Sequence, residues 1–139
     1  MHLRRRGALA GAVSAALWQF TDPLFKRAFG TPYSDSELLS AFVTRGRLQP
    51  AVGLALHASV GAGFGYAFVR LGGRGPGAGV VAAVAENVVL WPGMVVFDRV
   101  HPNRRDGTWP RLTTNPRVFA QATAAHALFG ALLGVFARA

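Results

Sequence analysis

Residues 48–69 read LQPAVGLALHASVGAGFGYAFV, a run of 22 residues without Asp, Glu, Lys or Arg. Residues 118–137 form a second such run of 20 residues, VFAQATAAHALFGALLGVFA. Two further runs, 75–97 and 7–25, hold one acidic residue each. A helix needs about 20 apolar residues to cross the core of a bilayer. Four such runs in 139 residues predict an all-α integral membrane protein, built as a four-helix bundle.

The composition agrees with a membrane protein. Charged residues make up 15% of the chain, against roughly 25% in soluble domains. The length leaves room for a single membrane domain, residues 1–139. A soluble bundle with unusually apolar helices is the alternative. The run 7–25 is the weakest candidate, because behind the three arginines at 4–6 it also resembles a signal peptide.

The predicted spans are residues 7–25, 50–70, 77–97 and 116–138. Pro23 is expected to bend or end the first span, and Pro92 to kink the third. Between the first two spans, Ser34 and Glu37 resemble a capping box. We therefore predict a short amphipathic helix over 35–44, lying at the membrane surface.

The pattern small-x3-His-x3-Gly-x3-Gly occurs twice. Its first copy is Gly53, His57, Gly61 and Gly65, and its second copy is Ala122, His126, Gly130 and Gly134. Leu-Trp at 17–18 and at 90–91 adds a looser match. We predict a tandem duplication of a two-helix unit, with repeat one at about 7–70 and repeat two at about 77–138, related by a pseudo-twofold axis along the membrane normal. Chance similarity between two apolar, glycine-rich helices is the alternative.

Small residues four apart let helix backbones approach closely, which matters in lipid because no hydrophobic drive holds the helices together. The predicted packing positions, one to three on each of the four predicted helices, are Gly11, Gly53, Gly61, Gly65, Gly79, Ala122, Gly130 and Gly134. Such faces predict tight contacts within the bundle or between copies in a homo-oligomer.

A buried polar cluster is predicted from Glu86, Asn87, His57 and His126. A carboxylate at mid-bilayer is costly unless it is paired or protonated. At a rise of 1.5 Å per residue, Glu86 lies at a depth of roughly 17 Å and His57 at roughly 13 Å, both measured from the same membrane surface. The two depths differ by less than one helical turn, so Glu86 can reach His57, or His126 at the matching position of the second repeat. The functional interpretation is a relay for protons or cations, and the structural interpretation is a buried hydrogen-bonded pair.

No cofactor is predicted, and no nucleophile–base set, P-loop or zinc-protease motif is present, so no catalytic residue is assigned. One alternative remains open: His57 and His126, at equal depth under the repeat, are candidate ligands of haem b. The aromatic residues Trp18, Trp91, Trp109 and Tyr33 resemble interfacial belt residues.

The net charge of +9 reflects basic residues at the ends of apolar runs. There they meet the lipid bilayer and its anionic headgroups, so nucleic acid is not the expected partner. His101 lies in a basic loop and is a further candidate for lipid phosphates, although an ordinary solvated loop explains it as well.

Short motifs in the second half carry a resemblance. ENVVLWP at 86–92, DRVHP at 98–102 and NPRVFAQ at 115–121 resemble a group of small uncharacterised actinobacterial membrane proteins. HALFGALLG at 126–134 is similar to the ending of YagU-type inner-membrane proteins. The resemblance implies a multi-pass protein of the bacterial inner membrane and assigns no catalytic residue.

Three functions stay open. The first is a non-enzymatic membrane protein that acts through helix packing, as an accessory subunit of a complex or a homo-oligomer. The second is a small proton- or ion-coupled transporter or channel that uses Glu86, His57 and His126. The third is a haem-binding protein. From the distribution of arginines we expect both termini in the cytoplasm, with dual topology as the alternative.

Overall fold

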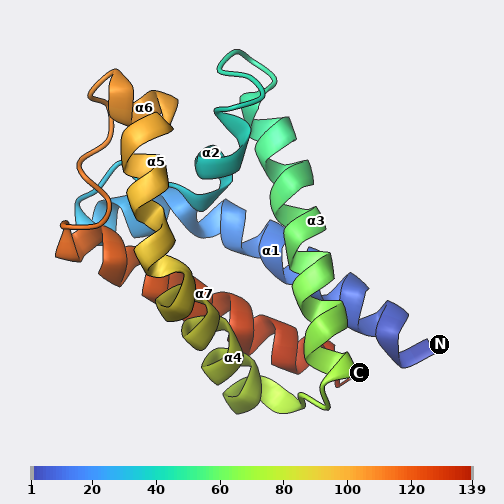
Figure 1. The fold of residues 1–139 in the computed structure, drawn as a ribbon. Helices are drawn as coiled ribbons and strands as arrows, with labels where there is room; N and C mark the ends of the chain where they lie inside the picture. Colours follow the sequence, from blue (N-terminus) through green and yellow to red (C-terminus); the bar gives the residue numbers. More distant parts are fainter. Residues whose placement is uncertain (1, 139) are drawn as a thin grey trace.

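A computed structural model describes residues 2–138, and every regular element in that range is helical (Figure 1). The elements, in chain order, are α1 (His2–Phe29), α2 (Asp35–Ser40), α3 (Gln49–Arg70), α4 (Gly75–Leu90), the 3₁₀ turn η1 (Trp91–Gly93), α5 (Met94–Val100), α6 (Pro102–Arg105) and α7 (Pro116–Phe136). The all-helical fold class is therefore confirmed.

Three segments are long and apolar enough to cross a membrane: α3, the continuous stretch Gly75–Val100, and α7. The predicted second, third and fourth spans are confirmed as such segments. α1 is not among them, because Gln19, Asp22 and Pro23 lower the hydropathy of its second half. The first predicted span, residues 7–25, thus stays a prediction.

Some predicted boundaries are wrong. α1 continues through Pro23 to Phe29, since a proline removes one N–H but does not stop a helix whose flanking turns are intact. α2 ends at Ser40, so the predicted helix 35–44 is too long, although Ser34 accepts a hydrogen bond from the Glu37 amide as expected. Pro92 interrupts the third span as predicted, in the form of η1.

Two helix pairs pack through glycine. In the first pair, α1 crosses α3 antiparallel, and a Cβ added at Gly11 would overlap the carbonyl group of Gly61. In the second pair, α4 crosses α7 in the same way, and a Cβ at Gly79 would overlap the carbonyl group of Gly130. Gly7 against Gly65, and Gly75 against Gly134, extend the contacts by one helical turn toward the same end of the molecule. Backbone contact at this distance requires glycine on both sides.

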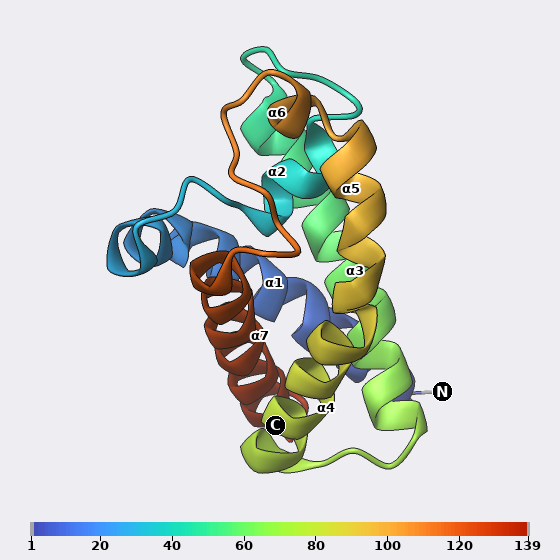
Figure 2. The same ribbon diagram turned by 60° about the vertical axis from the view of Figure 1, so that its left-hand side comes forward.

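The two pairs meet through α1 and α7, and α2 packs on α3 (Figure 2). Gly53 faces Ser36 and Ser40 of α2, so this predicted packing position contacts the short helix rather than a second span. Both termini lie at the end of the molecule that holds the turn between α3 and α4 (Figure 1). The opposite end, residues 30–48 and 101–115, is called the loop end below.

The loop end has its own core, in which Tyr33 and Trp109 are 1% and 2% exposed. The ring of His101 stacks on Trp109 with centroids 4.4 Å apart, and its Nδ1 accepts a hydrogen bond from the Asn103 amide. The interpretation of Tyr33 and Trp109 as belt residues is therefore wrong. His101 is fully buried too, so it is not available to lipid phosphates. These rings are buried because the loops fold over one another, which the local sequence does not indicate.

Candidate functional site

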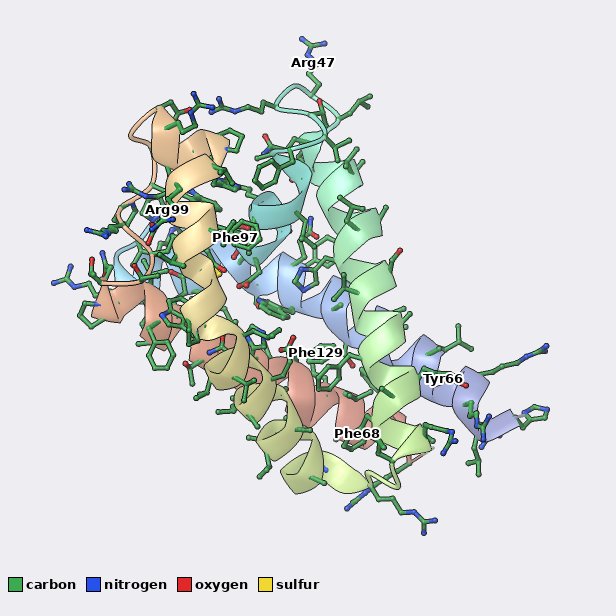
Figure 3. The ribbon with its side chains drawn as sticks, in the orientation of Figure 1. Arg47, Tyr66, Phe68, Phe97, Arg99 and Phe129 are labelled. Carbon is green, nitrogen blue, oxygen red and sulfur yellow. The ribbon has the colours of Figure 1, made fainter. Side chains whose placement is uncertain are left out.

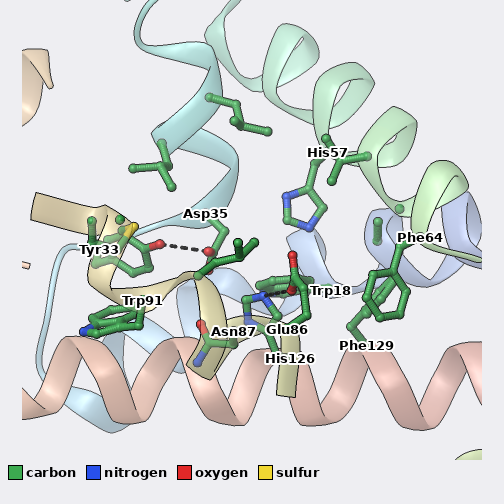
Figure 4. A pocket seen from close by; sticks show the side chains of 18 of the residues that line it. Trp18, Tyr33, Asp35, His57, Phe64, Glu86, Asn87, Trp91, His126 and Phe129 are labelled. Carbon is green, nitrogen blue, oxygen red and sulfur yellow. Dashed lines mark hydrogen bonds and ion pairs between the residues drawn. The ribbon is translucent and has the colours of Figure 1, made fainter. Parts of the chain in front are cut away.

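A partly open cavity of about 400 Å³ lies between the two helix pairs. α3 bounds it on one side and α4, η1 and α5 on the other, while α2 lies toward the loop end (Figure 4). α1 and α7 contribute Trp18, His126 and Phe129. Most of the lining is apolar or aromatic, and a few polar groups converge on it. This composition is typical of small-molecule sites.

Glu86 and His126 form an ion pair on the wall of this cavity. The distance from Glu86 Oε2 to His126 Nε2 is 3.2 Å, and the side chains come from α4 and α7 (Figure 4). His126 Nδ1 lies 2.7 Å from the carbonyl oxygen of Ala122, one turn back on its own helix. A carbonyl oxygen only accepts, so Nδ1 carries a proton. The proton between Nε2 and Glu86 then belongs to the pair, which is neutral overall whichever partner holds it.

His57 enters the same cavity from α3. Its ring contacts the Trp18 indole edge-on, with centroids 4.4 Å apart, and Trp18 also contacts His126 at 4.8 Å. Trp18 is 6% exposed. The two histidines are therefore linked through one indole ring, and the hydrogen bond to Glu86 belongs to His126.

Asn87, the fourth predicted member of the polar cluster, donates from Nδ2 to Thr123 Oγ1 at 3.1 Å. This bond ties α4 to α7 beside the cavity that Asn87 also lines. On α1, Gln19 makes a similar bond to α3, from Nε2 to the Pro50 carbonyl at 3.2 Å. Asn87 therefore supports helix packing and lies next to the ion pair.

Asp35, which the sequence did not single out, is a second carboxylate at the cavity. It is the first residue of α2, and the Tyr33 hydroxyl donates to its Oδ1 at 2.8 Å (Figure 4). Burial raises the pKa of Asp35 to about 6, and the Tyr33 hydrogen bond offsets part of that rise. Protonated Asp35 therefore stabilises the fold at low pH, and this contribution is lost as the pH rises through about 6.

The two histidines do not fit a bis-histidine haem. The Trp18 indole touches both imidazole rings, so a flat cofactor held between them would have to displace it. His126 Nε2, the nitrogen free of the backbone, faces Glu86. Among the described residues, no group of three or more His, Cys, Asp or Glu side chains has the arrangement of a metal site.

The sequence prediction and the structure agree in part on the site. Glu86, Asn87, His57 and His126 all line one cavity, and Glu86 pairs with His126, one of the two partners anticipated. Asp35 and Trp18 were missed as site residues. The position of Asp35 at the start of α2 was visible in the sequence as part of the capping region. Its nearness to Glu86 was not, because it depends on how α2 packs against α3, and no local sequence pattern encodes that contact.

Comparisons with known proteins identify no relative, since no family model, no curated protein and no solved structure matches this chain. The resemblance to actinobacterial and YagU-type membrane proteins therefore stays a prediction, and the functional argument depends on the site alone.

Proposed function

We propose that this chain is a four-span protein of the bacterial inner membrane, with both termini in the cytoplasm. In this proposal it moves protons through its central cavity as a proton- or ion-coupled transporter. The observation that carries the proposal is the Glu86–His126 pair on the wall of the cavity. Ionisable pairs inside membrane proteins are costly, and they commonly mark ion or proton pathways.

The outer face of α1 supports the assignment of this helix as a membrane span, in addition to the three segments described above. Leu9, Val13, Phe20 and Leu24 lie on that face, and each is at least 48% exposed. A stripe of this kind would be solvated by lipid if α1 crosses the bilayer. Its polar residues point elsewhere: Gln19 bonds to α3, and Asp22 pairs with Lys26 at 3.6 Å.

A tandem duplication is part of the proposal. The glycine crossings, meaning the close glycine-to-glycine contacts of α1 with α3 and of α4 with α7, match each other and support it. Gly11 meets Gly61 as Gly79 meets Gly130, and in both pairs the repeated histidine lies one turn before the contacting glycine, toward the N-terminal end of its helix. In this alignment Trp18 corresponds to Glu86 rather than to Trp91, because small residues set the packing register. The Leu-Trp match read from the sequence is shifted by more than one turn.

The test is proton uptake into vesicles. Purified protein is reconstituted with a pH-sensitive dye inside, and a potassium gradient with valinomycin makes the lumen negative. Wild-type vesicles should acidify faster than empty vesicles, and Glu86→Gln should reduce that rate at least tenfold because glutamine cannot bind or release a proton. Glu37→Gln is the matched control, since Glu37 pairs with Lys26 at 2.7 Å outside the central cavity.

Two results would contradict the proposal. If Glu86→Gln conducts like the wild type while remaining folded, the pair is not the pathway. If Glu86→Gln abolishes expression and assembly, the pair is structural. In that second case a non-enzymatic accessory subunit or homo-oligomer is favoured, and the exposed apolar stripe of α1 is the surface available for a partner or a second copy.

A further inference from the structure

The cavity combines two features, carboxylates and aromatic ring faces. The carboxylates are Asp35 and Glu86. The rings, five from helical elements and one from the loop before α2, are Trp18, Phe64, Trp91, Phe97, Phe129 and Tyr33. Phe129 points from α7 into the space between α3 and α4 (Figure 3), and it packs edge-on against Phe64 with centroids 5.4 Å apart. Within the described part of the chain, no Lys or Arg lines this cavity.

From this lining we infer that the cavity binds a monovalent lipophilic organic cation, such as an aryl or alkyl quaternary ammonium, against Glu86 and the aromatic rings. The inference deepens the proposed function by naming the substrate class, and it depends on that function. A quaternary ammonium has no hydrogen-bond donor, so it needs ring faces and a nearby negative charge rather than precise acceptors. The volume of about 400 Å³ suits a small organic ion and is far larger than a bare metal ion requires.

The charges of the site favour a cation over an anion. Glu86 and His126 share one proton, so the empty pair has no net charge. Asp35 adds a carboxyl group within electrostatic range of both. An anion would face two carboxylates and no permanent cation. A neutral ligand could use the carboxylates only through hydrogen-bond donors, and it would leave their negative charge without a counter-ion.

The Glu86–His126 pair also couples cation binding to proton release. When the cation binds beside Glu86, the ionised carboxylate is its counter-ion, and the proton of the pair leaves to water, with His126 neutral. The net charge of the cavity is then unchanged, because one positive charge has replaced another. When a proton returns to the pair, the cation loses its counter-ion and leaves. One cation is thus exchanged for one proton, with no net charge moved. In the absence of the cation the pair takes up and releases protons alone, and this is the movement that the membrane potential drives in the vesicle test.

Tryptophan emission measures the binding directly. Two of the three tryptophans, Trp18 and Trp91, line the cavity, whereas Trp109 lies in the core of the loop end. Detergent-solubilised full-length protein is titrated with benzyltrimethylammonium, and in parallel with neopentylbenzene, which has the same shape without the charge, and with benzenesulfonate. The cation should quench the emission saturably, at least tenfold more tightly than either of the others.

Proton release is measured in the same titration with an indicator dye in weak buffer. About one proton should leave per cation bound in the wild type and in Glu37→Gln, and none in Glu86→Gln. Asp35→Asn is a second variant if Glu86→Gln does not fold, and it should weaken cation binding severalfold without abolishing proton release.

The outcomes separate the two proposals. If neopentylbenzene or benzenesulfonate binds as tightly as the cation, or if the cation does not bind, the inference is wrong, while proton uptake that depends on Glu86 would still support the proposed function. If the cation binds without releasing a proton, the ligand class stands and proton coupling is wrong.

Discussion

The two crossing helix pairs share a packing scheme and differ in the residue that faces the histidine. In α1 and α3, the glycine crossing is followed by Trp18 against His57, an aromatic contact with centroids 4.4 Å apart. In α4 and α7, the equivalent crossing is followed by Glu86 against His126, an ion pair of 3.2 Å. Backbone packing is therefore the same in both pairs, whereas the chemistry belongs to one of them. The Trp18 indole gives the cavity an apolar surface, and the Glu86 carboxylate gives it a charged group.

Replacing the indole should have the largest effect on stability. Trp18→Ala removes a 6% exposed ring that contacts His57, His126 and Phe129, so we expect a loss of about 3–5 kcal/mol in the free energy of unfolding. Trp91→Ala is the matched control, because Trp91 is only partly buried and should cost less. Unfolding in mixed detergent micelles measures both. Equal losses would show that Trp18 is not the link between the pairs.

Adding a methyl group at the glycine crossings should have a smaller effect, equal in the two pairs. Gly11→Ala and Gly79→Ala each place a Cβ against a facing carbonyl group, and overpacking of this kind costs roughly 1–3 kcal/mol. Gly63→Ala and Gly77→Ala are the controls, since a Cβ at either position meets nothing within 4 Å. If the thermal midpoint of Gly11→Ala matches that of Gly63→Ala while Gly79→Ala falls, the pairs are not packed equivalently.

The smallest effect concerns the connection between the two halves at the loop end. Asp106 accepts hydrogen bonds from Thr108 and from Arg45, and these lower the pKa of Asp106 to about 2. A lowered carboxyl pKa contributes stability above the ordinary value of 3.8, and this contribution is lost as the pH falls toward 2. Asp106→Asn should therefore lose stability at pH 7 and show a flatter decline between pH 4 and 2. Unfolding midpoints across that range test the change, and parallel curves would contradict it.

The part of the site that was predictable from sequence followed from periodicity and polarity. His57 and His126 stand in matched small-residue stripes, and Glu86 is the acidic residue of its apolar run. Their depth along the helices was enough to bring Glu86 within reach of a histidine. Which histidine pairs with Glu86 could not be predicted, because depth does not say which helix faces which. The glycine crossings decide that α4 lies on α7, and so select His126.

By itself the sequence determined the helical architecture, the three confirmed membrane-length segments, the cap at Ser34 and the break at Pro92, because each depends on local hydropathy, capping or the chemistry of proline. Only the tertiary structure decided that Asp35 joins the site, that Trp18 separates the two histidines, and that Tyr33, Trp109 and His101 are buried. Those outcomes depend on how α2 and the loops fold over the helix pairs. Contacts between residues far apart in the chain are set by packing of the whole bundle and leave no local pattern.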